Sequence, residues 1–583
     1  MQVFVGFSVA SGVFFAWEIC LSEGIISTAV TSALHEALRK AQTDGQLRLA
    51  VWPSLVFDIP KRAEWGDLST TVAMGLAKGE KRPPREIADV IASHLQWKTD
   101  LFDHVDVVPP GYINLTIKRD QWFRVLTEIE QQGTAYGDST VRAGQKVLIE
   151  FVSANPTGPL HVGHGRGAAV GDALAHLLTR TGADVTREYY VNDVGTQVET
   201  LGKSVLMRVP QEGLGVELKD APLPEGLYQG QYISEIATAF VESQPLPAMK
   251  NGEADVAEAG RFAKDLLLRE ILADLHQFNV RFDAVFEEHT LYDNGVVPDA
   301  LDALRAKEYV YTSEEADWLA TSRWGDDKDR VVKRANGQYT YFASDIAYHV
   351  HKFNRGFQQL INVWGADHHG YVPRMKAMIH ALGYSENSFQ VSLVQLVSLV
   401  RSGKPVAMST RAGEFVTLRE VMDEVGVDAA RFFFLMRRSD TPLDFDLDLA
   451  QRKSNDNPVF YVQYAHARIT SLFKMAQEQG MNVPSVSEVD LTLLGFPEEL
   501  ALVKKLAEYP ELISESARCL EPHRVAYYLQ DLAGLLHSYY YKHRILQVNA
   551  SALTLARLVL MGAVQTVVRN GLTVLGVSAP ETM

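Results

Sequence analysis

From about residue 146, apolar positions alternate between short runs of strand length and longer runs with helical spacing. Lys146–Glu150 is a compact, largely apolar run, and residues 168–180 repeat apolar positions at the spacing of one helical face. Asp184–Val191 is a second run of strand length. A strand, a helix and a strand in this order predict a βαβ unit with two parallel strands.

The same alternation resumes after a long interruption. Residues 200–338 read as a mostly helical insertion, with two stretches rich in proline, glycine and charge that indicate surface loops. Beyond it, the pattern predicts a strand over Gln358–Trp364, a helix over Val372–Leu382 and a strand over Phe389–Val400. Because strand and helix alternate on both sides of the insertion, we expect a split, Rossmann-like α/β domain.

The regions on either side of this domain have different patterns. Upstream, two helical runs and two alternating strands predict a small α+β domain. Downstream of Asn455 helical spacing dominates, and Val559–Val577 is expected to be the core helix of an all-α domain. The upstream helices are expected at 25–41 and 83–92 and the strands at 105–108 and 112–117, and the downstream helices at 459–476, 522–543 and 554–575.

The chain of 583 residues is too long for one core, and its length predicts about three to four domains. We therefore expect a multidomain α/β protein. Its parts are an N-terminal extension (1–25), an α+β domain (26–120), a Rossmann-like domain with its insertion at about 200–338 (121–450), and an α-helical domain (451–583).

Composition narrows the functional classes. A hydrophobic fraction of 46% and a charged fraction of 22% are typical of a soluble globular protein. The net charge of −16 argues against a generally basic nucleic-acid-binding surface, but it leaves room for a local basic face. Only two cysteines occur, Cys20 and Cys519, so the sequence excludes a disulfide framework and a cysteine-rich structural zinc site.

The first residues resemble the apolar core of a signal peptide. Met1–Ala16 carries no charge, but it lacks a basic leading region and is too short to cross a bilayer as a helix. We interpret it as an extension of a cytoplasmic protein without membrane contact. Export is the alternative.

The turn after Lys146–Glu150 carries the first candidate chemistry. Two histidines, His161 and His164, lie where the strand gives way to the helix, and Gly163 removes a side chain between them. A strand–turn–helix junction presents backbone N–H groups and the positive end of a helix, which suits phosphate. An ordinary βα turn with solvated histidines is the alternative.

The residues themselves resemble a known family. His161-Val-Gly-His164 is similar to the "HIGH" signature of class I aminoacyl-tRNA synthetases, and Ser153 to Leu160 resembles its form in arginyl-tRNA synthetases. Residues 60–116 resemble the N-terminal domain of that family, which implies contact with the elbow of tRNA, and the helical tail resembles its anticodon-binding domain. The resemblance implies activation of L-arginine with ATP and transfer of the arginyl group to tRNA(Arg). Family behaviour further implies that tRNA must bind before activation.

The resemblance also assigns the ATP site. It implies catalytic roles for His161, Gly163 and His164 in the signature and for Ser409 and Arg411 in Ala407-Met-Ser-Thr-Arg411, which occupies the place of the "KMSKR" loop. Both lysines of that loop are replaced, by Ala407 and Thr410, so Lys404 is expected to help bind the phosphates. Mg²⁺ is expected to arrive with ATP, without a metal site built by the protein. The expected ATP-binding residues are Pro159, His161, Gly163, His164, Lys404, Met408 and Ser409.

Recognition of arginine requires buried carboxylates, since a guanidinium is always charged and has five donors. Tyr341 and Asp345 are neighbours on one helical face, and Glu288 follows an apolar pair; the pattern alone favours surface acids. The resemblance implies instead that these three residues hold the guanidinium. It further implies that Ser153 and Asn155 hold the α-amino and carboxylate ends and that Gln197, Asp367 and His368 border the pocket.

Two other functions stay open at this point. The chain can be another class I synthetase or nucleotidyl transferase that shares the same βα turn, although Glu288 and Asp345 argue for arginine. It can also be a non-catalytic tRNA-binding paralogue, which Ala407 and Thr410 would suit, but the intact signature histidines argue against decay. In either case we expect a monomer.

Overall fold

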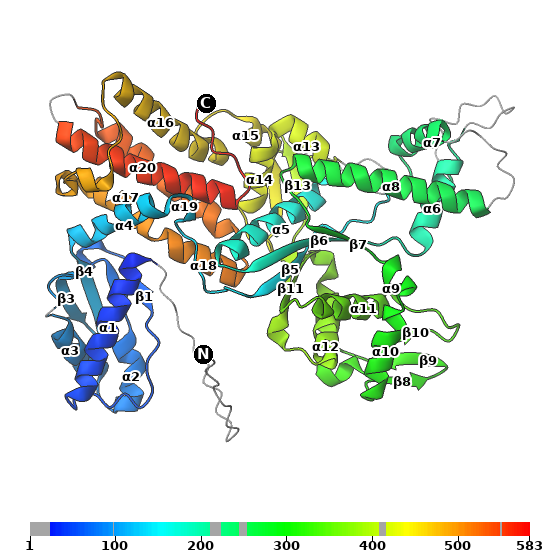
Figure 1. Ribbon diagram of the computed structural model, residues 1–583, viewed down its shortest axis with the longest axis horizontal. Helices are drawn as coiled ribbons and strands as arrows, with labels where there is room; N and C mark the ends of the chain where they lie inside the picture. The colour runs from blue at the N-terminus through cyan, green and yellow to red at the C-terminus, as the bar shows by residue number, and fades with distance from the viewer. Residues whose placement is uncertain (1–23, 97, 210–222, 244–252, 407–415, 548–550) are drawn as a thin grey trace, which may run out of the picture. The chain divides into compact units, whose positions relative to one another are not determined.

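The computed structural model describes residues 24–96, 98–209, 223–243, 253–406, 416–547 and 551–583 (Figure 1). The chain divides between residues 128 and 129 into two compact units. Most of the predicted N-terminal extension, including Cys20, lies outside the described residues, as do Ala407, Met408, Ser409, Thr410 and Arg411.

The first unit is an antiparallel sheet with helices packed on it. Its strand order is β1-β2-β4-β3, and α3 buries Ile87, Ile91 and Leu95 on one face. The predicted α+β architecture is confirmed. The elements are α1 (Ile25–Thr43), β1 (Phe57–Asp58), β2 (Leu68–Thr70), α2 (Val72–Glu80), α3 (Pro84–Leu95), β3 (Phe102–Val108) and β4 (Tyr112–Ile117), and α4 (Arg119–Gln132) leads into the second unit.

A five-stranded parallel sheet organises the second unit (Figure 1). Its order is β12-β11-β5-β6-β7, and every neighbouring pair is parallel, which confirms the predicted doubly wound fold. The carboxyl ends of the strands therefore meet at one edge, where such sheets bind ligands. The strands are β5 (Lys146–Glu150), β6 (Asp184–Val191), β7 (Ala284–Glu287), β11 (Gln359–Gly365) and β12 (Phe389–Val394), and three helices beside them are α5 (Val162–Arg180), α11 (Tyr341–Asn354) and α12 (Val372–Leu382).

The segment over 200–338 differs from the prediction of a mostly helical insertion. Helices α6, α7 and α8 fill it only to Gln277; β7 then joins the main sheet, and β8, β9 and β10 form a small antiparallel sheet. Four-residue strands are too short to show a period, and Glu314 and Glu315 occupy a turn with positive φ, which reads as a loop. These elements are α6 (Thr196–Leu206), α7 (Gln231–Ser243), α8 (Glu253–Gln277), α9 (His289–Asp293), α10 (Val296–Ala306), β8 (Val310–Ser313), β9 (Ala316–Leu319) and β10 (Arg330–Lys333).

The single strand predicted over Phe389–Val400 is two strands in two sheets. β12 ends at Val394, and β13 (Val397–Arg401) pairs instead with β14 (Lys404–Pro405) and β15 (Leu443–Asp446). Gln395 separates them, and its carbonyl oxygen accepts a hydrogen bond of 2.9 Å from the buried guanidinium of Arg166 on α5. The apolar run continues across the break, so hydropathy could not locate it.

The C-terminal part is all helical after β15, as predicted. One helix among the described residues, α20, is long and apolar enough to cross a membrane, but 61% of its most apolar window is buried inside the protein. It is therefore the core helix expected from its pattern. The helices are α13 (Leu418–Val425), α14 (Val427–Leu435), α15 (Leu447–Gln451), α16 (Pro458–Glu478), α17 (Pro497–Ala507), α18 (Tyr509–Cys519), α19 (His523–Lys542) and α20 (Ser551–Val574).

A buried arginine joins the parallel sheet domain to this helical part. Arg431 on α14 has no exposed surface and donates to Asp172 on α5 at 2.6 Å. It also donates to the backbone oxygen of Leu575, just after α20, at 3.0 Å, and to that of Phe278 at 3.0 Å. Since each donor has a partner in a different segment, this side chain fixes α5, α14 and the end of α20 together.

Arg431→Met should therefore destabilise the protein strongly. The substitution removes the partner at 2.6 Å from buried Asp172, which then keeps His176 and Arg187, each 3.8 Å away; breaking a buried pair typically costs about 3–5 kcal/mol. Urea unfolding monitored by tryptophan fluorescence measures the loss. Arg401→Met, which removes an exposed pair with Glu424, is the matched control and should shift the midpoint little. Equal shifts for the two variants would contradict this role of Arg431.

Candidate active site

The predicted junction is built around two stacked histidines. His161 is the N-cap of α5, and its Nδ1 accepts a hydrogen bond from the backbone N–H of Gly163 at 3.1 Å. The Nδ1 of His164 accepts from the backbone N–H of His161 at 3.3 Å, and the ring centroids lie 3.7 Å apart. The helix begins at Val162, six residues before the predicted start. The two reciprocal hydrogen bonds cap its first turn, so the glycine-containing segment is helical as well.

Burial determines the charge of these rings. It lowers the pKa of His161 and lowers that of His164 to about 3, with the neighbouring His161 charge adding to the effect. Both imidazoles are therefore neutral near pH 7. Because each Nδ1 accepts a hydrogen bond, the ring proton is on Nε2, and each histidine offers one N–H donor at the positive end of a helix.

The chain returns to this junction directly after residues 407–415. The N–H of Leu418 donates to the carbonyl of Leu160 at 2.8 Å, and Thr417 forms a β-bridge with His161. A Cβ on Gly165 would lie 2.6 Å from Leu418 Cδ1, so glycine is needed for this close approach. Lys404 is exposed on β14, before the same segment.

The loop between β5 and α5 is held in an unusual backbone conformation. Val152 and Ser153 have φ values of 64° and 41°. The Oγ of Ser153 donates to Glu150 Oε1 at 3.2 Å and accepts from the N–H of Tyr190 at 3.1 Å. Asn155 is exposed beyond this anchor, and Pro159 is half-buried.

Two acids from different elements lie close enough beyond the sheet for the charge of one to act on the other. Glu288, just after β7, is 1% exposed, and burial raises its pKa despite hydrogen bonds from Ser344 and Tyr190. Burial also raises the pKa of Asp345 on α11 to about 7, although the hydroxyl of Tyr371 donates to its carboxylate. Neither acid forms an ion pair with a lysine or arginine within the described part of the chain.

The other residues expected to border the arginine site are exposed. Tyr341 opens α11 one turn before Asp345; it is 60% exposed, and its hydroxyl is 3.6 Å from the position of a Cβ on Gly195. Gln197 is exposed in the first turn of α6. Asp367 and His368 are also exposed, on the short helix η4 (Ala366–Tyr371).

Sequence reasoning missed several residues that complete the pocket. Glu150 ends the central strand, Tyr190 lies on β6 and Tyr371 ends η4. Asn192 follows β6, and its amide, oriented to donate, lies 3.1 Å from Glu288 Oε2. Of these, Glu150 carried a usable signal, because a charge at the end of an otherwise apolar central strand is seldom there for packing.

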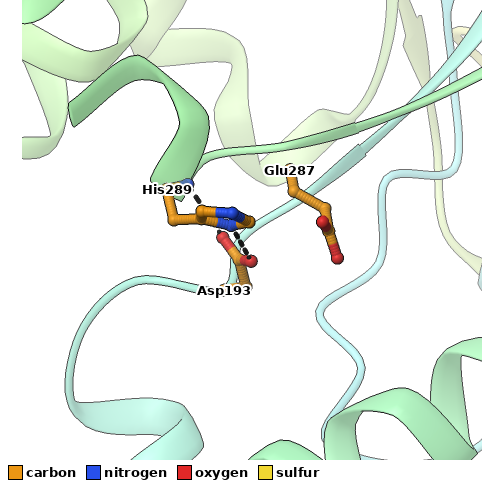
Figure 2. Close-up of side chains that lie close together, drawn as sticks. All are labelled: Asp193, Glu287 and His289. Carbon is orange, nitrogen blue, oxygen red and sulfur yellow. Dashed lines mark hydrogen bonds and ion pairs between the residues drawn. The ribbon is translucent and has the colours of Figure 1, made fainter. Parts of the chain in front are cut away.

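A second polar cluster, shown in Figure 2, includes both sequence neighbours of Glu288. The Oδ2 of Asp193 is 2.6 Å from His289 Nδ1, and ligand atoms of these two residues and Glu287 lie within 4.8 Å of one another. Such a group could hold a metal ion. However, the ammonium of Lys264 already lies 3.0 Å from Glu287 and 3.7 Å from Asp193. The contact with Asp193 raises the pKa of His289 and ties the end of β6 to α9.

Comparison with known protein families assigns nearly the whole chain. A family model for the class I tRNA synthetase catalytic domain (R) matches residues 125–440. Models for the arginyl tRNA synthetase N-terminal domain and the DALR anticodon binding domain match residues 26–117 and 462–583.

Curated relatives and solved structures agree with these matches. The chain is 52% identical over 541 residues to an arginine–tRNA ligase of Citrifermentans bemidjiense, covering 93% of this chain and 97% of the relative. It is 50% identical over 566 residues to that of Desulfosudis oleivorans, covering 96% and 99%.

Among solved structures, a putative arginyl-tRNA synthetase of Campylobacter jejuni is 33% identical, with a TM-score of 0.72 over 80% of this chain and 100% of that one. The arginyl-tRNA synthetase of Thermus thermophilus has the same fold, with 23% identity and a TM-score of 0.75 over 95% of this chain and 99% of that one. The three family models together cover most of the chain, and the curated relatives match it nearly end to end. The chain therefore belongs to the arginyl-tRNA synthetases of the class I family.

Proposed function

We propose that Glu288 and Asp345 hold the guanidinium of L-arginine while this chain works as an arginyl-tRNA synthetase. The observation that carries the assignment is a pair of buried carboxylates without a cationic partner, at the carboxyl edge of the sheet. In the first step the arginine carboxylate attacks the α-phosphorus of ATP, forming arginyl-adenylate and releasing diphosphate. A hydroxyl of the 3′-terminal adenosine of tRNA(Arg) then takes the arginyl group and releases AMP.

The pocket chemistry fits a guanidinium better than a simple ammonium. A planar guanidinium presents five donors, and carboxylates from β7 and α11 can accept them from two sides. Tyr341 covers the outer side of the pocket. Ser153 and Asn155, on the strained loop after β5, bind the α-amino and carboxylate ends, and Gln197 borders them.

The ATP site lies at the start of α5. The neutral His161 and His164 each direct an Nε2–H towards the phosphates, and the backbone of Gly163 leaves room for the adenine. Pro159 borders the same turn. Lys404, Met408, Ser409 and Arg411 supply the second half of the site, and Mg²⁺ arrives bound to ATP and offsets phosphate charge.

The remaining parts of the chain bind the tRNA. We assign residues 26–120 to the elbow, 121–450 to catalysis and 451–583 to the anticodon. In the last part Tyr541 is 91% exposed, and the guanidinium of Arg468 lies 3.7 Å from the ring centroid of Tyr540, which suits stacking of unpaired bases. We propose a cytoplasmic monomer without membrane contact.

Arginine-dependent ATP–diphosphate exchange tests this function. With tRNA(Arg) present, arginine should support exchange, and the other nineteen amino acids should not. Omitting tRNA tests the requirement for tRNA in activation. Absence of arginine-dependent exchange by a folded protein that binds tRNA would identify a non-catalytic paralogue instead.

The second prediction concerns pH. Asp345 must lose its proton to pair with a guanidinium, and its pKa of about 7 lies well above the ordinary 3.8. The KM for arginine should therefore fall about tenfold for each pH unit up to about 7 and level off above it. Asp345→Asn should raise the KM for arginine strongly and remove this dependence, with little effect on the KM for ATP. Equal effects on both substrates would exclude Asp345 from specificity.

The same proton affects folding in the opposite direction. Ligand-free protein holds the Asp345 proton more tightly than the unfolded chain does, so the contribution of this group to stability decreases as pH rises from about 4 to about 7. Urea unfolding of Asp345→Asn over this range should lack that contribution. Parallel pH profiles for both proteins would mean that Asp345 does not titrate there.

Lys404 and Arg411 are the cations that could replace the missing lysines. Lys404→Met and Arg411→Met are measured separately for exchange rate. Replacing the residue that binds the phosphates should lower kcat by about 10²–10³-fold, because that residue stabilises charge that develops in the transition state. A small and equal effect of both substitutions would place the phosphate stabilisation on the signature histidines alone.

A further inference from the structure

We propose that Lys352 is a positioning residue for arginine recognition, acting through Glu150 without touching the substrate. This inference rests on the proposed function and adds a residue to it. Lys352 lies on α11, two turns after Asp345, and its side chain has no exposed surface. A buried lysine at the base of a pocket that binds a cation requires explanation, because its charge repels the ligand.

The contacts of Lys352 explain its placement. Its Nζ lies 2.5 Å from Glu150 Oε2 and 3.9 Å from the ring centroid of Tyr348. The hydroxyl of Tyr348 in turn donates to Glu188 Oε1 at 2.7 Å, and Arg355 binds the other oxygen of that carboxylate at 2.5 Å. The ammonium thus contacts α11 and β5, and Tyr348 links it to the ion pair of Glu188 with Arg355.

Glu150 also contacts the loop that precedes the His161–His164 signature. Besides Lys352, it accepts a hydrogen bond of 3.2 Å from Asn362 on β11 and one of 3.2 Å from Ser153. Ser153 is one of the two residues held at positive φ, and it is also bound to the backbone of β6. The pair therefore connects the helix that carries Asp345 to the loop that carries Ser153 and Asn155.

The same pair sets the charge that arginine meets. Glu150, Glu288 and Asp345 place three acids around one small volume, and the charges of Glu150 and Glu288 both raise the pKa of Asp345, whereas Lys352 lowers it. The hydroxyls of Tyr190 on β6 and Tyr371 on η4 face the same acids. Behind them, His349 on α11 is neutral, since burial and Lys352 lower its pKa to about 3.

Without Lys352, the charge of Glu150 is uncompensated and Asp345 holds its proton to higher pH. At neutral pH a larger fraction of the pocket is then unable to pair with a guanidinium. Lys352 therefore favours the ionised form of Asp345 by offsetting the charge of Glu150.

Steady-state exchange kinetics of Lys352→Met test the proposal. We expect the KM for arginine to rise about fivefold at pH 7, because a rise of about one unit in the pKa of Asp345 lowers its ionised fraction from about one half to about one tenth. The KM for ATP should stay within about twofold. The pH above which the KM for arginine levels off should move upward from about 7, a change that loss of stability alone does not produce. Lys376→Met, which breaks an exposed pair with Glu386, is the matched control.

A double variant keeps the test decisive if the single one folds poorly. Lys352→Met leaves the charge of buried Glu150 without a cationic partner, whereas adding Glu150→Gln removes both charges. The double variant should therefore fold better than Lys352→Met and recover part of the affinity for arginine. If it is no better in folding or in KM, charge pairing is not the contribution of Lys352.

Two further results distinguish a positioning role of Lys352 from a purely structural one and from failure of the proposed function. Equal rises in the KM for arginine and ATP, or an unmoved pH profile, would reduce Lys352 to a structural residue. These variants are compared only with an active wild-type protein. Failure of arginine-dependent exchange in the wild type would instead remove the proposed function itself.

Discussion

Two carboxylates buried without a cationic partner are the constraint on which the rest of the catalytic half depends. Burying an ionised acid in this way opposes folding. Burial therefore favours the protonated forms of Glu288 and Asp345, and the pKa values of both are raised. Hydroxyls of Tyr190 and Tyr371 offset part of the penalty without supplying charge. A cation bound between the two acids would offset this penalty, which is the basis of the proposed arginine site.

The proposed phosphate site lies at the same carboxyl edge of the parallel sheet as these acids. β5, at its centre, ends in Glu150, and eleven residues later His161 caps α5, so the pocket and the helix start are two ends of one loop. Thr417, which follows residues 407–415 in the sequence, forms a β-bridge with His161. The proposed phosphate site at the neutral histidines and the proposed arginine site at the acids would hold the two reacting groups close together, as attack of a carboxylate on a phosphorus requires.

Sequence patterns predicted the long helices and strands and the residue types of the proposed site. They did not predict the residues that hold the proposed site residues in place. The βαβ unit around β5, α5 and β6 followed from periodicity, and the helical tail followed from its apolar spacing. β7 was missed because four residues carry no period, and the break at Gln395 was missed because apolar residues flank it on both sides. Lys352 was missed for a different reason: within an amphipathic helix, a lysine reads as solvated, and only the burial of α11 against β5 shows its partner.

Proton release on arginine binding tests the central claim most directly. Isothermal titration calorimetry in buffers of different ionisation enthalpy, at pH 6, measures the number of protons that leave the protein when L-arginine binds. If Asp345 titrates near 7 and pairs with the guanidinium, about one proton should be released at pH 6 and far fewer at pH 8. Binding with no proton release at pH 6 would contradict the account, because the pocket would then bind arginine without ionising its buried acid.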